Sequence, residues 1–211
     1  MDKITTLIFD IDGTILDTQE FIFQATEYAL ATSGYSVPER SIIAKNVGKS
    51  FPEYYFSLTN SEKDIDKLID THRAFQYLNF NLAKLFPNAL ETLKTLKNKG
   101  YKLAVVTTRS KKTSHQNLID SNIFNLFNIV ISGDDVKKIK PDPEPLLMAL
   151  EFMQELPEKA IMIGDSYLDI QAGKNAGTKT IRATYGFHID KLHEPEPDFF
   201  ISDISDLLKL L

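Results

Sequence analysis

Short apolar runs rich in β-branched residues alternate with longer amphipathic stretches along most of this chain. The runs have the length of buried strands, and the stretches have the spacing of helices that pack one face against a core. The predicted strands are 4–9, 102–108, 128–132, 160–164, 179–184 and 198–202, the last with a weaker pattern. The predicted helices are 88–99, 110–121, 143–154 and 167–176. This alternation predicts an α/β fold, a doubly wound parallel sheet with helices on both faces.

One interval, between the first two predicted strands, contains no convincing strand. Its predicted helices are 17–33, 38–46, 51–59 and 61–85. Asp17 and the glutamate three residues later have the form of a capping box at the start of the first helix. Pro87 is placed to open the next core helix. We therefore expect a core domain formed by 1–15 and 87–211, and an inserted α-helical domain at 16–86.

Polar side chains follow the predicted strands directly. Ligands of an open parallel sheet bind beyond the carboxyl ends of its strands, so these are the candidate site residues. They are Asp10, Asp12, Gly13 and Thr14 after the first strand, Thr107 and Thr108 after the second, Gly164, Asp165, Ser166 and Asp169 after 160–164, and Lys140 ahead of the helix at 143. Four chain segments thus bring carboxylates, hydroxyls and one lysine to a common edge.

Several carboxylates in one crevice raise one another's pKa unless a cation neutralises them. Oxygen ligands without cysteine or suitably spaced histidine select a hard ion such as Mg²⁺, which readily takes a further ligand from a phosphate. Lys140 would balance the remaining negative charge, while threonine hydroxyls and the amides near Gly13 would donate hydrogen bonds to phosphate oxygens. The residues therefore indicate a small phosphorylated substrate.

Asp10 and Asp12 can divide the chemistry of phosphoryl transfer. Asp10 can attack phosphorus to form an aspartyl-phosphate, and Asp12 can protonate the leaving oxygen and later deprotonate the attacking water. Two alternatives for this segment are a plain turn and an EF-hand calcium loop, but the loop would need glycine and glutamate where Ile15 and Phe21 stand. Asp169 has an alternative of its own, since its spacing from Ser166 is that of a helix capping box.

These motifs resemble those of the haloacid dehalogenase-like (HAD) hydrolase superfamily, in its phosphatases with a helical cap inserted after the first strand. The resemblance covers essentially the whole chain and rests on four ordered motifs, FDIDGT, the threonine of AVVTT, the lysine of KPDPEP, and GDSYLD. It implies a Rossmann-like core with Asp10 as nucleophile and Asp12 as acid and base. It further implies Thr107 and Lys140 as phosphate ligands, and Asp10, the Asp12 carbonyl and Asp165 as Mg²⁺ ligands supported by Asp169.

The resemblance also narrows the reaction. Superfamily members that dehalogenate or cleave C–P bonds lack an aspartate at the position of Asp12, so phosphoester or phosphoanhydride hydrolysis is implied. The chain is similar to phosphoglycolate phosphatases and, through KNAGTKT (174–180) and HEPEPDF (193–199), to small bacterial pyrophosphatases. Thr108 departs from the asparagine that many phosphoglycolate phosphatases have there, and Arg109 follows it, which weakens the case for glycolate chemistry.

Other functions remain open at this point. A β-phosphoglucomutase-like phosphosugar mutase uses the same core, and a non-catalytic phosphate-sensing module could share the fold. A dehalogenase is the third alternative, but the dehalogenating members of the superfamily have no aspartate at the position of Asp12. In the insertion, the glycine turn at 45–50 is either an exposed helix connection or a specificity loop in which Lys49 meets an anionic part of the substrate.

Composition restricts the partners. The 211 residues carry a formal net charge of -5 and no cysteine. An acidic chain offers no broad basic surface for nucleic acid, and the absence of cysteine excludes disulfides and thiol catalysis. Neither a signal-peptide pattern nor an apolar run of membrane-spanning length is present. We expect a cytoplasmic protein without nucleic-acid or membrane partners, a monomer by default, with a dimer compatible with the sequence.

Overall fold

The computed structural model describes residues 4–187 and 195–211, so the first two residues of HEPEPDF lie outside the described part. The chain forms two compact units, 1–17 with 84–211 and 18–83. The boundaries expected from the sequence were 15/16 and 86/87. They differ because two short strands, β2 (Leu16–Asp17) and β3 (Lys84–Leu85), pair antiparallel and belong to the larger unit. Two-residue strands are too short to show a periodic pattern.

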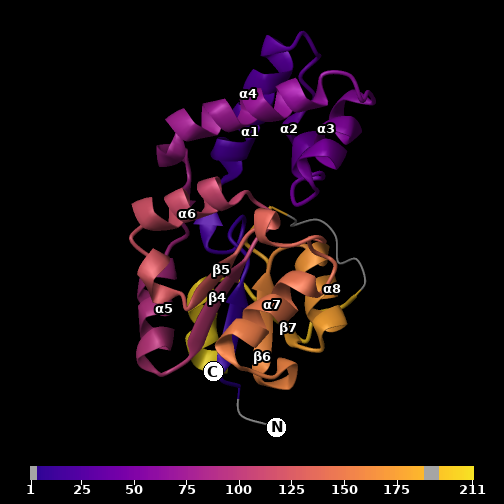
Figure 1. Cartoon of the computed structure of the whole chain (residues 1–211). Helices are drawn as coiled ribbons and strands as arrows, with labels where there is room; N and C mark the ends of the chain where they lie inside the picture. Colours follow the sequence, from indigo (N-terminus) through magenta and orange to yellow (C-terminus); the bar gives the residue numbers. More distant parts are fainter. Residues whose placement is uncertain (1–3, 188–194) are drawn as a thin grey trace. The chain divides into compact units, whose positions relative to one another are not determined.

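A six-stranded parallel sheet forms the centre of the larger unit (Figure 1). Its order is β5-β4-β1-β6-β7-β8. The strands are β1 (Thr6–Phe9), β4 (Lys102–Val106), β5 (Ile129–Ile131), β6 (Ala160–Gly164), β7 (Lys179–Ala183) and β8 (Phe199–Ile201). All six lie within the predicted ranges. The winding reverses at β1, which pairs with β4 on one side and β6 on the other. The predicted doubly wound α/β fold is therefore confirmed.

Helices cover both faces of this sheet. They are α5 (Ala89–Asn98), α6 (Lys111–Asp120), α7 (Glu144–Met153), α8 (Tyr167–Ala176) and the short α9 (Leu207–Leu210). Figure 1 shows α7 and α8 on one side of the sheet and α5 on the other. Side chains of α7 and α8, such as Leu146 and Ala172, join strand residues such as Ile8 and Met162 in one fully buried cluster. Burial of these apolar side chains holds the strand ends in place.

The smaller unit is helical. It contains α1 (Gln19–Thr32), α2 (Arg40–Ala44), α3 (Phe51–Thr59) and α4 (Ile65–Leu78) around a buried apolar cluster. Two tyrosines of α3 satisfy their hydroxyls inside it, Tyr54 with Thr26 at 2.6 Å and Tyr55 with His72 at 2.8 Å. Among the helices of 4–187 and 195–211, none is long and apolar enough to cross a membrane.

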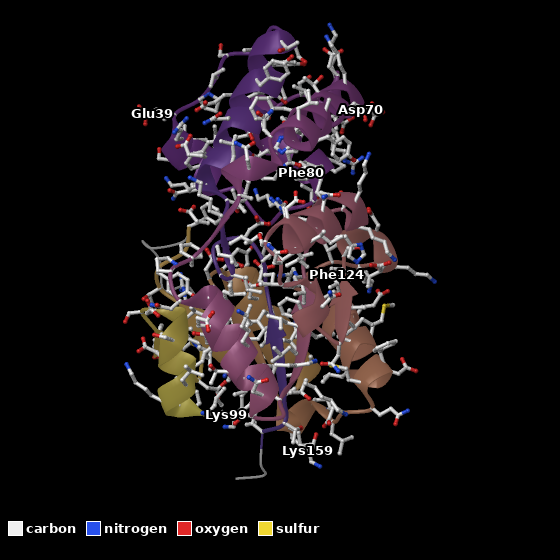
Figure 2. All side chains as sticks on the ribbon, turned by 90° about the vertical axis from the view of Figure 1, so that its left-hand side faces the viewer. Glu39, Asp70, Phe80, Lys99, Phe124 and Lys159 are labelled. Carbon is white, nitrogen blue, oxygen red and sulfur yellow. The ribbon has the colours of Figure 1, made fainter. Side chains whose placement is uncertain are left out.

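Three local predictions were wrong. Asp17 belongs to β2, and α1 begins after Thr18 without a side-chain cap, so the predicted capping box does not form. Pro87 lies in a turn, while Asn88, with a φ of 64°, precedes α5. The predicted helix 61–85 is shorter in the structure. It begins at Ile65 and ends at Leu78, where Asn79 leaves helical geometry with a φ of -133°. Phe80, labelled in Figure 2, then stacks on the ring of Phe21, with the ring centroids 6.1 Å apart.

Candidate active site

The carboxyl ends of β1, β4 and β6 place the site. Asp10 directly follows β1, and its backbone N–H still donates to the carbonyl of Ile163 in β6 at 2.9 Å. Thr107 follows β4 in the same way and donates to Ile131 of β5. Lys99 and Lys159, which precede β4 and β6, both lie at the opposite, amino end of the sheet (Figure 2). The strand register therefore brings the polar residues after each strand to one edge.

Lys140 lies between two carboxylates inside this edge. Its Nζ donates to Asp10 Oδ1 at 2.7 Å, to Asp169 Oδ1 at 2.6 Å and to the Val106 carbonyl at 3.0 Å. These three bonds use all the donors of the ammonium group. The side chain is only 3% exposed, and the two neighbouring carboxylates raise the pKa of Lys140 against the opposing effect of burial. Lys140 is therefore a charged group held between Asp10 and Asp169.

Asp169 has two sets of partners. Its Oδ1 accepts from Lys140, and its Oδ2 accepts from the backbone N–H and the hydroxyl of Ser166 at 3.0 and 2.6 Å. Ser166 Oγ accepts in return from the Asp169 amide, which closes a capping box at the start of α8. Asp169 therefore caps α8, as the alternative interpretation predicted, and it also belongs to the charged cluster.

The segment 185–187, which the sequence analysis did not predict as part of the site, contacts Asp165. The Phe187 backbone N–H donates to Asp165 Oδ2 at 2.6 Å. A Cβ at Gly186 would come within 2.5 Å of the Asp165 side chain and of the Gly13 carbonyl, so only glycine allows this approach. The Tyr185 hydroxyl donates to the Thr14 carbonyl at 2.9 Å and ties the segment to the loop after β1. No local pattern in the sequence signals a contact between positions so far apart in the chain.

The Asp12 side chain makes a different contact from that of Asp10. Its Oδ2 lies 2.8 Å from Nε of Arg109, and both side chains are nearly buried. Thr107, also buried, accepts the Arg109 backbone N–H on its hydroxyl at 3.2 Å, and Thr108 is half-buried. Lys49 belongs to the smaller unit and donates to two polar side chains of that unit.

Three carboxylates of the site suit a divalent cation. Asp10, Asp165 and Asp169 each offer an oxygen, and these atoms lie within 4.8 Å of one another. Burial raises the pKa of Asp10 to about 7, against the effect of Lys140, and burial with the neighbouring carboxylates raises the pKa of Asp165 well above its ordinary value. Lys140 pairs with only two of these three buried carboxylates, Asp10 and Asp169, so the cluster favours a further positive charge. An all-oxygen donor set fits a hard ion such as Mg²⁺.

Comparison with known proteins identifies the family. Residues 7–183 match the family described as haloacid dehalogenase-like hydrolase. The chain belongs to this family. Pyrophosphatase PpaX from Bacillus cereus is 34% identical over 99% of this chain and 97% of its own. A Haemophilus somnus crystal structure described as a predicted phosphoglycolate phosphatase has a TM-score of 0.92, with 25% identity over 100% of this chain and 99% of its own. CbbY from Rhodobacter sphaeroides, solved with phosphate, shares the fold at a TM-score of 0.84 and 21% identity, over 97% of this chain and 96% of its own.

As a haloacid dehalogenase-like hydrolase, the protein is an enzyme. The matched region contains Asp10, Lys140, Asp165 and Asp169, which the structure brings into one cluster, and Asp12, which it pairs with Arg109. This confirms the superfamily resemblance drawn from the sequence motifs. The cluster is therefore the candidate active site of this hydrolase.

The raised pKa of Asp10 predicts how the stability of the metal-free hydrolase depends on pH. A carboxyl whose pKa rises from 3.8 to about 7 on folding binds its proton more tightly in the folded state. Asp10 therefore contributes its full stabilisation of the folded protein below about pH 4. This contribution decreases as pH rises to about 7, by at most about 4 kcal/mol. Urea unfolding in chelator should show this loss in wild type, and Asp10→Asn should reduce it. The same pH slope in both proteins would contradict the assignment.

Proposed function

We propose that this hydrolase is a Mg²⁺-dependent phosphatase that acts on a small phosphorylated metabolite through an aspartyl-phosphate at Asp10. The observation that carries the proposal is the arrangement of Asp10 and Asp12. Two carboxylates two residues apart follow the central strand, one bound to Lys140 and the other to Arg109. Different partners allow one carboxylate to act as nucleophile and the other as acid and base.

Asp10 attacks phosphorus, and the bond from phosphorus to the leaving oxygen breaks. Lys140 orients the Asp10 carboxylate through the 2.7 Å bond and offsets charge on the transferred group. Asp12 gives its proton to the leaving oxygen and then takes one from the water that attacks the aspartyl-phosphate. That second displacement releases inorganic phosphate and restores the Asp10 carboxylate, so the two steps balance.

Residues at the same edge bind the phosphoryl group in this proposal. The hydroxyls of Thr107 and Thr108 and the backbone amide at Gly13 donate to its oxygens. Gly13 has a φ of 74°, and a Cβ there would come within 2.7 Å of the Asp165 carboxylate, so this position accepts only glycine. We assign the inserted helical unit, 18–83, the role of a substrate-selecting cap, with Lys49 as its contact to an anionic group.

The proposed Mg²⁺ ligands are the carboxylates of Asp10 and Asp165 and the backbone carbonyl of Asp12, with Asp169 as a direct or supporting partner. A bound Mg²⁺ would supply positive charge to the cluster and to the oxygens of the phosphoryl group. Removal of the ion by EDTA should abolish phosphate release, and excess Mg²⁺ should restore it. Calcium added at the same concentration serves as the control for non-specific stabilisation. Full activity in chelator would contradict the metal assignment.

The substrate class follows from the relatives and from Asp12. Relatives of this chain include a pyrophosphatase and a predicted phosphoglycolate phosphatase, so the proposed substrates are pyrophosphate and small phosphomonoesters such as phosphoglycolate. The test is a panel of pyrophosphate, phosphoglycolate, sugar phosphates and nucleoside monophosphates, assayed for phosphate release. Conversion of a hexose 1-phosphate to its isomer, with a trace of bisphosphate, would replace the proposal with a mutase. No turnover across the panel would favour a sensing module.

A further inference from the structure

Arg109 joins the loop after β4 to Asp12, across the adjoining strand ends. Its Nε lies 2.8 Å from Asp12 Oδ2, and the two side chains are only 8% and 12% exposed. The attraction between groups this well shielded from water is screened less than that of a surface pair, and the contact holds both groups in one geometry. The proposed function uses Arg109 only as the partner that distinguishes Asp12 from Asp10, and it assigns Arg109 no role of its own.

The other side of the guanidinium group is anchored. Nη1 of Arg109 donates to the side-chain carbonyl of Asn117, a buried residue of α6. Asn117 belongs to α6 and is only 2% exposed, so the bond to it limits the positions that the guanidinium can take. Asp12, Arg109 and Asn117 therefore form a continuous chain of polar contacts from the loop after β1 to α6.

The backbone of Arg109 is fixed as well. Its N–H donates to the Thr107 hydroxyl at 3.2 Å, and its carbonyl accepts from the Gly133 N–H at 2.8 Å. A Cβ at Gly133 would lie 2.6 Å from the carbonyl oxygen of Thr108, so glycine is required for this close approach of the two loops. Arg109 is thus held at its backbone and at two of its guanidinium nitrogens, Nε and Nη1.

We propose that Arg109 is the positioning residue for Asp12, and that Asn117 is its anchor. The inference rests on the proposed phosphatase function and deepens it. Proton transfer to a leaving oxygen requires the donor within hydrogen-bond reach and correctly oriented, and small misplacements cost large factors in rate. Arg109 holds one Asp12 oxygen and so restricts the rotation of the carboxyl group. Without Arg109, Asp12 remains in the sequence but loses its fixed position.

The test compares two substrates of similar shape, phenyl phosphate and 4-nitrophenyl phosphate. Phenol is a much poorer leaving group than 4-nitrophenol, so cleavage of phenyl phosphate depends more on protonation by Asp12. The ratio kcat/KM reports the steps up to release of the leaving group. In Arg109→Gln we expect kcat/KM to fall about 30-fold for phenyl phosphate and about 3-fold for 4-nitrophenyl phosphate. Arg109→Lys should recover part of the selective loss.

The quotient of the two kcat/KM values is independent of the fraction of enzyme that folds, because both substrates are measured on one preparation. Asn117→Ala should change this quotient in the same direction by a smaller factor. The matched control is Lys111→Gln, which removes an exposed cation two residues further on that pairs with Asp135. This control should leave the quotient unchanged.

A quotient in Arg109→Gln equal to that of wild type would overturn the positioning role, because a purely structural residue or a direct phosphate ligand would lower both values equally. No phosphate release by wild type, either from these two substrates or from the panel of pyrophosphate, phosphoglycolate, sugar phosphates and nucleoside monophosphates, would instead contradict the proposed function itself, and this inference with it. The two failures are therefore distinguishable.

Discussion

Asp10→Asn is expected to reduce phosphate release by at least about 10⁴-fold while the protein remains folded. An amide oxygen is a far weaker nucleophile than a carboxylate, so the attack on phosphorus is lost. The substituted side chain keeps nearly the same shape and can still accept the hydrogen bond from Lys140. Above pH 7, where wild type has lost the stability that the protonated Asp10 carboxyl contributes, the variant should be at least as stable as wild type. Steady-state kinetics and urea unfolding measure the two quantities.

The matched control for this variant is Asp120→Asn. Asp120 is an exposed residue at the end of α6 that accepts from Gln116. The same chemical change there should leave kcat and KM unaltered. Retention of a tenth or more of wild-type activity in Asp10→Asn would contradict the role of Asp10 as nucleophile.

Lys140→Met should destabilise the folded protein as well as inactivate it. The ammonium group is fully buried and bonds to two carboxylates, so its removal leaves both as buried, uncompensated charges. Loss of one partner of a buried ion pair typically costs about 3–5 kcal/mol. We expect the free energy of unfolding to fall by about this amount at pH 8 in metal-free buffer. The deficit should shrink near pH 5, where the raised pKa of Asp10 lets that carboxyl bind a proton.

Lys138→Met is the control for the loss of a lysine from the same loop. Lys138 is largely exposed and pairs with Asp142 at 3.5 Å, so its removal should change stability by less than about 1 kcal/mol. Phosphate release should also be unaffected. Equal stability of Lys140→Met and wild type at pH 8 would show that Lys140 does not neutralise Asp10 and Asp169.

The sheet and its winding could be predicted because buried parallel strands leave a strong signal in the sequence. Each of the six predicted strands contains an observed one, and helices α5 to α8 end within one or two residues of the predicted ranges. Where the rule for ligand sites in parallel sheets is applied to these strands, it selects Asp10 and Asp165 without knowledge of the structure. The strand pattern and this rule together therefore predicted the edge where the charged cluster lies.

The remaining details depend on tertiary contacts that no local pattern encodes. The helix that continues in the sequence pattern ends before Asn79, and Phe80 then packs its ring on Phe21. The strands β2 and β3 pair over two residues only. The bond from the Phe187 amide to Asp165 joins positions 22 residues apart in the sequence. Arg109 is close to Thr107 in the sequence, but its contact with Asp12 depends on the fold and could not be predicted from the sequence.

The most direct test of the central claim is detection of phosphate on Asp10 itself. Asp12→Asn should slow hydrolysis of the aspartyl-phosphate, and 4-nitrophenyl phosphate should still form it because its leaving group needs little protonation. Acid quench during turnover, proteolysis and mass spectrometry would then locate the modified peptide. The account predicts one added phosphoryl group on the peptide containing Asp10, and none in Asp10→Asn. Phosphate release by wild type with no phosphorylated enzyme in either wild type or Asp12→Asn would contradict it.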